Sequence, residues 1–315
     1  MKPIVTLTIN PAIDKNTEVQ HVVSDRKLRC EKSVRGPGGG GINVSRAIHR
    51  LGGQSIAVYS AGGPPGDVLI SMLEKEGIEQ RPVRIKDFTR ENLTVCEKHS
   101  GRQYRFGMPG PQMQEDEWNN CLNELRQLDV KPAYIVASGS LPPGVPTNFY
   151  KKVARLAREI DARLTVDSSG EAFRAAVREE GVFLIKPNLA ELEALAGRPL
   201  ESENKQVNFA KELVKEGSGE AIVISLGSGG AVFVRGEEHY YFRAPTVKIR
   251  SKVGAGDSMV AGIVLAISRG DPLLDAVRFG IAAGSAAVMN PGSELCRKED
   301  AERLYNNMAA NDCSQ

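Results

Sequence analysis

Apolar runs of strand length alternate along this chain with longer segments in which apolar residues recur every three or four positions. The runs predict buried strands, and the recurring spacing predicts amphipathic helices. The strand-like runs include PIVTLTI, SIAVYSA, AYIVASGS, RLTVDSS, VFLIKPN and EAIVISLG, and the helix-like segments include INVSRAIHRL, DVLISMLEKEG and FYKKVARLAREI. This alternation predicts βα units that build a mostly parallel sheet, with ligands at the carboxyl ends of its strands. The predicted fold class is α/β.

Two segments, residues 17–35 and 84–107, break this rhythm. Both alternate apolar and polar residues without an intervening helix, and His99-Ser100-Gly101 predicts a hairpin turn in the second. We expect them to form a small antiparallel β-sheet, a lid that projects from the main domain. One face of such a sheet must be covered, either by a ligand cleft or by another subunit. The main domain would comprise residues 1–16, 36–83 and 108–315.

Composition narrows the classes of partner. The chain has 315 residues, 41% of them hydrophobic, which permits a large buried core. Its 41 basic and 39 acidic residues nearly cancel and form no dense basic block, so neither nucleic acid nor an anionic membrane is an expected partner. No apolar run approaches the length of a membrane span, and the stretch Ile4–Ile9 stops at Asn10-Pro11 without a basic leader. We therefore expect a cytoplasmic protein that binds small molecules.

The first candidate site is PGGGG at residues 37–41, directly before a predicted helix that carries Asn43. Residues 36–41 also match G-x-G-x-x-G, but a dinucleotide site needs that motif after the first strand and an acidic residue about 20 positions on, where Ala61 stands. A tight turn explains one or two glycines more easily than four. A small polar ligand lying against bare backbone explains them better, with the Asn43 amide donating to and accepting from its hydroxyls.

The second candidate site is VGAGDS at residues 253–258, where an apolar helix begins. Backbone N–H groups at a helix N-terminus stabilise anions, because they lack partners and lie at the positive end of the helix dipole. Asp257 stands inside this cradle. A carboxylate there can take a proton from a hydroxyl while the amides stabilise a transferring phosphoryl group. An ordinary N-cap is the alternative, but it does not require glycine at both Gly254 and Gly256.

A phosphoryl donor needs a site of its own. The chain contains no Gly-Lys dipeptide, which excludes the G-x-x-x-x-G-K-[ST] phosphate loop. The stretch SLGSGGA (225–231) follows an apolar strand and can wrap a nucleotide with its backbone. In KPNLAELE (186–193), Lys186 offers a charge for phosphates, while Asn188 and Glu191 can order the waters around Mg²⁺. For Glu191 alone, a position on a solvated helix face is the simpler interpretation.

Together these motifs resemble the ribokinase-like (phosphofructokinase B type) carbohydrate kinases. The resemblance rests on PGGGGINVSRA, KPN-x-x-E and VGAGDS in this order and spans nearly the whole chain; TINPAID, KLRC, FTRENL, MPG, SGSLPPG and VDSSGEA are similar to the phosphosugar kinases of that family. It implies a three-layer α/β/α sandwich with a projecting β-sheet lid. It also implies ATP and Mg²⁺ as cofactors, K⁺ as a further ion, and a homodimer formed through the lid.

The resemblance implies the following site residues. For the sugar phosphate they are Asp14, Gly39, Gly40, Asn43, Arg90, Ser138, Gly139 and Ser140, with Lys27 and Arg29 reaching the neighbouring subunit's site. For the transferring group they are Asp257 as base and Gly254, Ala255 and Gly256 as cradle. For the nucleotide they are Lys186, Asn188, Ser225, Gly227 and Gly230. For Mg²⁺, through water, they are Glu191, Asn188 and Asp167, and for K⁺, through backbone, Ser251, Val253, Asn290 and Gly292.

The expected activity is the Mg-ATP-dependent phosphorylation of D-fructose 6-phosphate at O1, giving fructose 1,6-bisphosphate. Tagatose-6-phosphate kinase and 1-phosphofructokinase activities remain open, because those substrates differ by one stereocentre or by the end that carries phosphate. An unphosphorylated acceptor would leave Arg90, Lys27 and Arg29 without a purpose. From a different class, a non-catalytic sugar-phosphate sensor on the same scaffold also remains open, because fold does not dictate chemistry.

Overall fold

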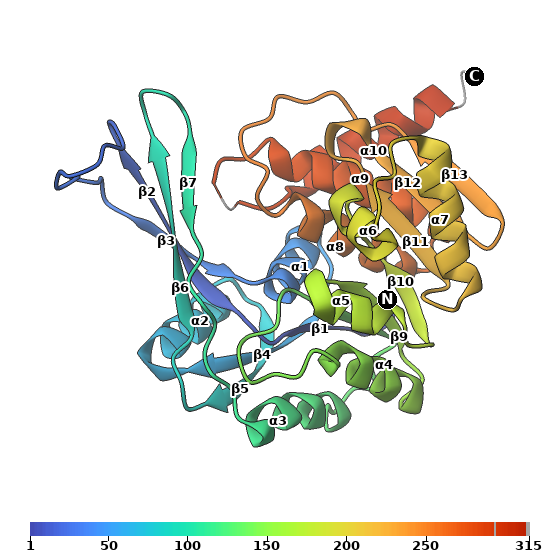
Figure 1. The fold of residues 1–315 in the computed structure, drawn as a ribbon, viewed down its shortest axis with the longest axis horizontal. Helices are drawn as coiled ribbons and strands as arrows, with labels where there is room; N and C mark the ends of the chain where they lie inside the picture. The colour runs from blue at the N-terminus through green and yellow to red at the C-terminus, as the bar shows by residue number, and fades with distance from the viewer. Residues whose placement is uncertain (293, 313–315) are drawn as a thin grey trace.

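The computed structural model describes residues 1–292 and 294–312 and is built on one large sheet (Figure 1). The strand order is β13-β12-β11-β10-β9-β8-β1-β4-β5, and all neighbours are parallel except β11–β12 and β12–β13. The predicted α/β class with a mostly parallel sheet is confirmed. Its strands are β1 (Ile4–Thr8), β4 (Ile56–Gly62), β5 (Glu79–Ile85), β8 (Tyr134–Ser138), β9 (Arg163–Asp167), β10 (Val182–Ile185), β11 (Ala221–Ser225), β12 (Ala231–Arg235) and β13 (Glu238–Phe242).

Helices cover both faces of this sheet and complete three layers. One layer holds α1 (Gly40–Arg50), α2 (Gly63–Lys75), α8 (Ala255–Arg269), α9 (Leu273–Val288) and α10 (Lys298–Asp312). The other holds α3 (Glu115–Arg126), α4 (Phe149–Glu159), α5 (Gly170–Val177), α6 (Leu189–Ala196) and α7 (Glu203–Lys215). Among the described residues, no helix is both long and apolar enough to cross a lipid bilayer.

The central strand β1 packs against both helix layers. Its side chains alternate between faces, so Val5 and Leu7 pack into the core formed with α3 and α4. Thr6 points to the opposite face, where its hydroxyl lies 2.9 Å from the hydroxyl of Ser45 on α1. A strand buried on both faces reads as a continuous apolar run, which is why the sequence pattern identified it.

The lid is a separate four-stranded sheet in the order β3-β2-β6-β7 (Figure 1). Its strands are β2 (Ala12–Val19), β3 (Val34–Gly38), β6 (Arg90–Glu97) and β7 (Gln103–Phe106). The predicted hairpin around His99-Ser100-Gly101 joins β6 to β7. The strands β2 and β3 extend beyond the predicted 17–35 segment, into residues 12–16 and 36–38.

The prediction of a purely antiparallel lid is wrong. The pairs β2–β3 and β6–β7 are antiparallel, but β2 and β6 at its centre are parallel. The reason is topological: β2 follows β1 and β6 follows β5, so the chain enters both strands from the main sheet. Two strands that leave the same body in the same direction pair in parallel.

Candidate active site

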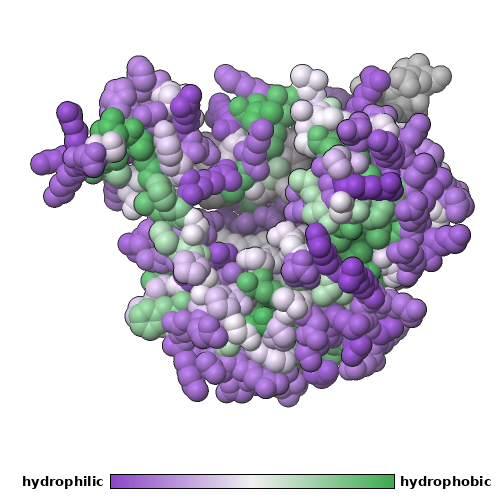
Figure 2. Space-filling model, viewed as in Figure 1, coloured by the Kyte–Doolittle hydropathy of each residue, from purple (hydrophilic) through white to green (hydrophobic). Residues whose placement is uncertain are grey.

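Four of the predicted site residues lie along one edge of the main sheet. Ser138 ends β8, Asp167 ends β9 and Ser225 ends β11, while Lys186 directly follows β10. The parallel register of these strands places all of their carboxyl ends at the same edge. Parts of the chain that are far apart in sequence therefore meet there. In Figure 2 the surface is hollowed between the lid and the rest of the molecule.

The candidate base, Asp257, lies in the first turn of α8. Gly254 is the N-cap of this helix and has φ +74°, the left-handed region that favours glycine. Asn43, in α1, donates a hydrogen bond from Nδ2 to Asp257 Oδ2 at 2.9 Å. The two glycine motifs of the sequence are thus joined by one side-chain contact. Asp257 and the cradle residues Gly254, Ala255 and Gly256 are all half-buried.

Burial and charge set the protonation of this centre. Burial raises the pKa of Asp257 to about 7; Asp167 and Asp14 add to the rise, while the Asn43 amide and Lys186 oppose it. Lys186 is itself buried, which lowers its pKa, but the Asp167 carboxylate at 3.2 Å outweighs burial and raises the pKa above the usual lysine value. Lys186 therefore stays a cation, and its charge opposes the rise in the pKa of Asp257.

The glycines of PGGGG are explained by packing against the protein itself. A Cβ on Gly39 would lie 2.8 Å from Thr8 Cγ2, and one on Gly41 would lie 2.6 Å from Thr8 Oγ1; a Cβ on Gly40 would collide with Ser138. Gly39 also has φ +118°. The sequence-based preference for a ligand over packing is thus not supported at these positions, because packing already requires glycine there. Gly39 and Gly40 are half-buried, whereas Gly41 is buried.

Two of the predicted sugar-phosphate residues, Asp14 and Arg90, lie at the base of the lid. Asp14 Oδ1 accepts a hydrogen bond from Asn92 Nδ2 at 2.9 Å. Arg90 donates from Nη2 to the Asn10 carbonyl at 3.1 Å and from Nη1 to the Met108 carbonyl at 3.2 Å. Its Nε is buried and has no hydrogen-bond partner within the described residues. Burial lowers the pKa of Arg90, and Asp14 opposes this effect. A buried donor without a partner points to a ligand atom.

Two residues of this region were missed by the sequence analysis. Asn10 is 5% exposed and donates from Nδ2 to Ser140 Oγ at 3.1 Å, while Asn92 also accepts at Oδ1 from the Met108 N–H at 3.1 Å. Asn10 belongs to the motif TINPAID and Asn92 to FTRENL, and their places in these motifs were the only sequence feature that could have identified them. The contacts themselves join segments that are far apart in sequence and could not be read from spacing.

A cavity of about 470 Å³ lies beside the cradle. It is lined by Asn188, Ser225, Gly227, Gly230, Ala255 and Gly256, as the sequence predicted for nucleotide residues and cradle, and by Lys252. Met259, Ile281 and Val247 give it an apolar wall. A Cβ on Gly256 would lie 3.5 Å from Lys186 Nζ and would fill the space between cradle and lysine. The cavity therefore fits a nucleotide whose base meets the apolar wall and whose phosphates meet the cradle.

Asn188 and Glu191 form the capping box of α6. Asn188 Oδ1 accepts from the Glu191 N–H at 2.9 Å, and Glu191 Oε2 accepts from the Asn188 N–H at 2.8 Å. Burial raises the pKa of Glu191. No group of three or more His, Cys, Asp or Glu side chains suited to a metal occurs in the part of the chain that the structure describes. This donor set fits Mg²⁺ held largely through water and phosphate oxygens.

The loops predicted to hold K⁺ come together. Ser251 Oγ donates to the Gly292 carbonyl at 2.6 Å and accepts from the Val253 N–H at 3.2 Å. Asn290 is buried and donates from Nδ2 to the Leu295 carbonyl at 3.0 Å. The carbonyl groups of both loops are therefore held close to the start of α8.

Two predicted residues stand apart from this site. Lys27 and Arg29 lie in the exposed loop between β2 and β3, and neither makes an ion pair within the described residues. A single chain does not bring them to Asp257. Their predicted role in a neighbouring subunit's site is neither met nor contradicted by this chain alone.

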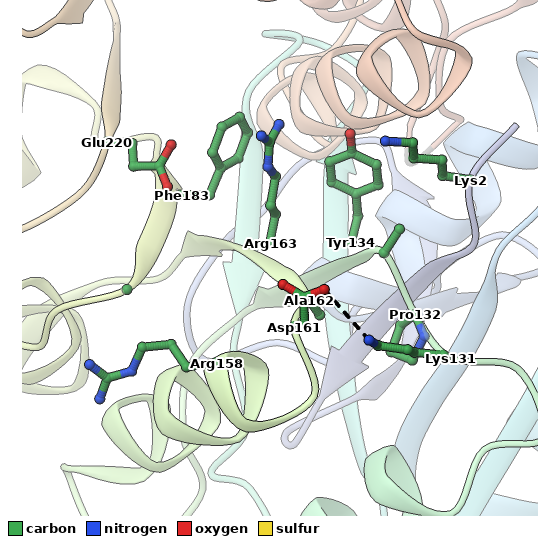
Figure 3. A pocket seen from close by; sticks show the side chains of 12 residues that line it. Lys2, Lys131, Pro132, Tyr134, Arg158, Asp161, Ala162, Arg163, Phe183 and Glu220 are labelled. Carbon is green, nitrogen blue, oxygen red and sulfur yellow. Dashed lines mark ion pairs between the residues drawn. The ribbon is translucent and has the colours of Figure 1, made fainter.

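A second cavity, of about 620 Å³, lies at the opposite edge of the main sheet (Figure 3). Three of its four cations have partners: Lys131 lies 3.5 Å from Asp161, Arg158 pairs with Glu179 at 3.1 Å, and Arg163 stacks over the ring of Phe183. It contains none of the predicted site residues. The candidate site is therefore the one at the carboxyl ends of the strands.

A family model describing the pfkB family of carbohydrate kinases matches residues 5–300. The chain belongs to this family. It is 42% identical over 305 residues to the ATP-dependent 6-phosphofructokinase isozyme 2 of Escherichia coli, covering 97% of this chain and 98% of the relative. It is 32% identical over 301 residues to the 1-phosphofructokinase of Bacillus subtilis, with 96% and 97% covered.

Solved structures of the Escherichia coli phosphofructokinase-2 superpose closely on this member of the pfkB family. The complex with fructose-6-phosphate gives a TM-score of 0.93 at 41% identity, and the complex with potassium gives 0.94 at 42% identity; each covers 98% of this chain and 100% of the other. The predicted three-layer sandwich with a lid is therefore the fold of the family.

Proposed function

We propose that this kinase is an ATP-dependent 6-phosphofructokinase that phosphorylates D-fructose 6-phosphate at O1 in glycolysis. The observation that carries the proposal is that the two candidate groups, Asp257 and Arg90, are both close enough to Asp14 for its charge to affect their pKa values. Asp257, whose pKa burial raises to about 7, lies in the first turn of α8 near Lys186, and the half-buried Arg90 at the lid base has an Nε donor without a partner among the described residues. The 42% identity to a 6-phosphofructokinase supports the choice of substrate.

Each residue then has a part in the reaction. Asp257 would take the proton of the sugar's 1-hydroxyl at Oδ1, since Oδ2 is engaged by Asn43. Lys186 and the N–H groups at the start of α8 would stabilise the charge on the transferring phosphoryl group. Asp14 and Asn43 would hold sugar hydroxyls, and Arg90 would hold the 6-phosphate. ATP is the phosphoryl donor, and Mg²⁺ neutralises phosphate charge when bound.

The ions and location follow from the same proposal. Asn188, Glu191 and Asp167 would hold Mg²⁺ through water. The carbonyls near Ser251 and Gly292 would hold K⁺, and a potassium complex of the Escherichia coli relative supports this assignment. The proposed location is the cytoplasm, where ATP and phosphosugars are consumed.

The substrate is tested by ADP production with Mg-ATP and four acceptors: fructose 6-phosphate, tagatose 6-phosphate, fructose 1-phosphate and fructose. We expect the highest kcat/KM with fructose 6-phosphate. A preference for fructose 1-phosphate would indicate the 1-phosphofructokinase alternative, which the 32% identity keeps as second candidate. Binding of phosphosugars without turnover would indicate the sensor.

The turnover should depend on pH through Asp257. Because a general base works only when deprotonated, and burial raises the pKa of Asp257 to about 7, kcat should fall as the pH drops below about 7 and level off above about 8. The measurement is kcat at saturating substrates between about pH 5.5 and 9. A flat profile across this range would remove Asp257 from its role.

We also propose a homodimer formed through the lid. Four apolar side chains are exposed on the lid or at its base, which Figure 2 shows as apolar colour over this part of the surface; they are Val23, Val34, Phe106 and Met108. Exposed apolar patches of this kind mark interfaces. A second copy would cover them and would bring Lys27 and Arg29 to the neighbouring site.

The lid interface can be broken by Val34→Glu, at a side chain that is 69% exposed. A charge buried against the partner should convert the dimer to monomer and lower kcat/KM for fructose 6-phosphate by at least about tenfold, since Lys27 and Arg29 would leave the partner's site. Sedimentation and steady-state kinetics measure both effects. Val130→Glu, at a 46% exposed valine outside the lid, is the matched control and should change neither.

A further inference from the structure

Arg46 connects the site to the body of the protein through four hydrogen bonds. It lies three residues after Asn43 on α1 and is 5% exposed. Its guanidinium holds the Glu76 carboxylate with two hydrogen bonds, Nε to Oε2 at 2.7 Å and Nη2 to Oε1 at 2.8 Å. The remaining nitrogen, Nη1, donates to the Pro37 carbonyl at 3.2 Å and to Asn43 Oδ1 at 3.4 Å. A planar group held at two points has a fixed orientation, so Nη1 is directed toward the Pro37 carbonyl and Asn43 Oδ1.

These contacts decide which way the Asn43 amide faces. Its oxygen meets the Arg46 guanidinium, and its nitrogen donates to Asp257 Oδ2 at 2.9 Å. The reverse orientation would set N–H against N–H on one side and oxygen against carboxylate on the other. With its oxygen turned toward the guanidinium, the amide presents an N–H donor, and not its acceptor, to Asp257. The amide therefore favours the charged form of Asp257, because a carboxylate binds a donor more strongly than a neutral carboxyl does.

We propose that Arg46 is a positioning residue for phosphoryl transfer, which locks the Asn43 amide with its donor toward Asp257 and so keeps that carboxyl ready to accept a proton. The inference rests on the proposed function for its kinetic consequence. Its hydrogen bonds go to Glu76, Pro37 and Asn43, so Arg46 would act on Asp257 through Asn43. Its Glu76 partner serves as the anchor, and its bond to Pro37 ties the glycine loop to the same group.

Other charges also face Asp257 and would remain when Arg46 is removed. Asp167 and Asp14 raise its pKa, and Lys186 lowers it. Without Arg46 the amide can turn its oxygen to Asp257 and accept a hydrogen bond from the protonated carboxyl. Removal should therefore stabilise the protonated form alone, and the pKa of Asp257 should rise.

The test is the double variant Arg46→Met/Glu76→Gln, which removes the guanidinium without leaving a carboxylate unpaired. The acid limb of kcat should move up by about one pH unit, the size of one hydrogen bond to a charged group. The loss of kcat should then be about fivefold at pH 7 and less than about twofold at pH 9. A merely structural role would lower kcat equally at all pH values.

Glu179→Gln is the matched control. It removes a buried carboxylate that pairs with Lys151, Arg155 and Arg158, remote from the site. It should leave the acid limb at its wild-type position. An unmoved limb in the double variant would overturn the proposal.

A direct titration separates this inference from the proposed function. The Asp257 carboxyl carbon can be followed by ¹³C NMR against pH, with its signal assigned by its absence in Asp257→Asn. This readout needs no turnover, so it remains valid if no sugar phosphate is phosphorylated. A higher pKa in the double variant supports the role of Arg46, and an unchanged pKa contradicts it.

Discussion

Asp257→Asn is expected to lower kcat by about a hundredfold to ten-thousandfold, the usual contribution of a positioned general base. Asparagine has nearly the same shape and can still take a hydrogen bond from Asn43 Nδ2, so the contact between α1 and α8 survives. It cannot take the hydroxyl proton. The affinity for fructose 6-phosphate should stay nearly unchanged, because Asp14 on β2 and Arg90 on β6 belong to the lid and not to α8. Steady-state kcat and a binding titration with fructose 6-phosphate measure the two effects.

The control for this variant is Asp271→Asn. Asp271 is exposed and lies just beyond the other end of α8, so it repeats the charge change without touching the site. It should leave kcat within about twofold of the wild type. Near-normal turnover of Asp257→Asn at saturating substrates would mean that another group takes the proton, and the assignment of the base would be wrong.

Several chemical groups of the site could be predicted from the sequence because their signal is local. Gly254, Gly256 and Asp257 stand within four residues, and glycines with a carboxylate at the start of a helix are typical of a site for a phosphoryl group. Lys186 follows an apolar strand directly, which placed it at the carboxyl edge of the sheet. For such residues, local spacing and strand position were enough.

Other features depend on pairings that local spacing does not encode. The contact between Asn43 and Asp257 joins residues 214 positions apart, and it exists only because α1 and α8 share one layer. The parallel pairing of β2 with β6 depends on the route of the chain through the main sheet between them. A pattern of alternating residues gives strand propensity but no direction of pairing, so the lid was predicted with the wrong central pair.

The glycines of PGGGG show a different limit. A glycine in a sequence indicates only that a side chain is missing. A nearby ligand, a tight turn and close packing can each require this. Only the positions of Thr8 and Ser138 reveal that packing already requires glycine at residues 39–41. The predicted role of Lys27 and Arg29 is limited in another way, because it depends on contacts with a second copy of the chain.

Arg90→Met should produce the second large effect, a fall in kcat/KM for fructose 6-phosphate of about a hundredfold to thousandfold. A fall of this size corresponds to the loss of about two charge-assisted hydrogen bonds to the 6-phosphate. Arg90 has the means to make such bonds, because its Nε is buried without a partner among the described residues and its guanidinium is held in place by the carbonyls of Asn10 and Met108. Methionine keeps the bulk of the side chain but no donor.

The comparison of fructose 6-phosphate with fructose decides whether Arg90 binds the phosphate. Fructose lacks the phosphate, so its low kcat/KM should hardly change in Arg90→Met, whereas that of fructose 6-phosphate should approach it. The KM for ATP should stay near the wild-type value, because the cradle at Gly254–Gly256 lies on α8 and not on the lid. Arg84→Met removes an exposed arginine that pairs with Asp67 on the main domain, and it serves as control. Equal losses with fructose and fructose 6-phosphate would mean that Arg90 supports the lid base without binding phosphate, and the phosphate site would have to lie elsewhere.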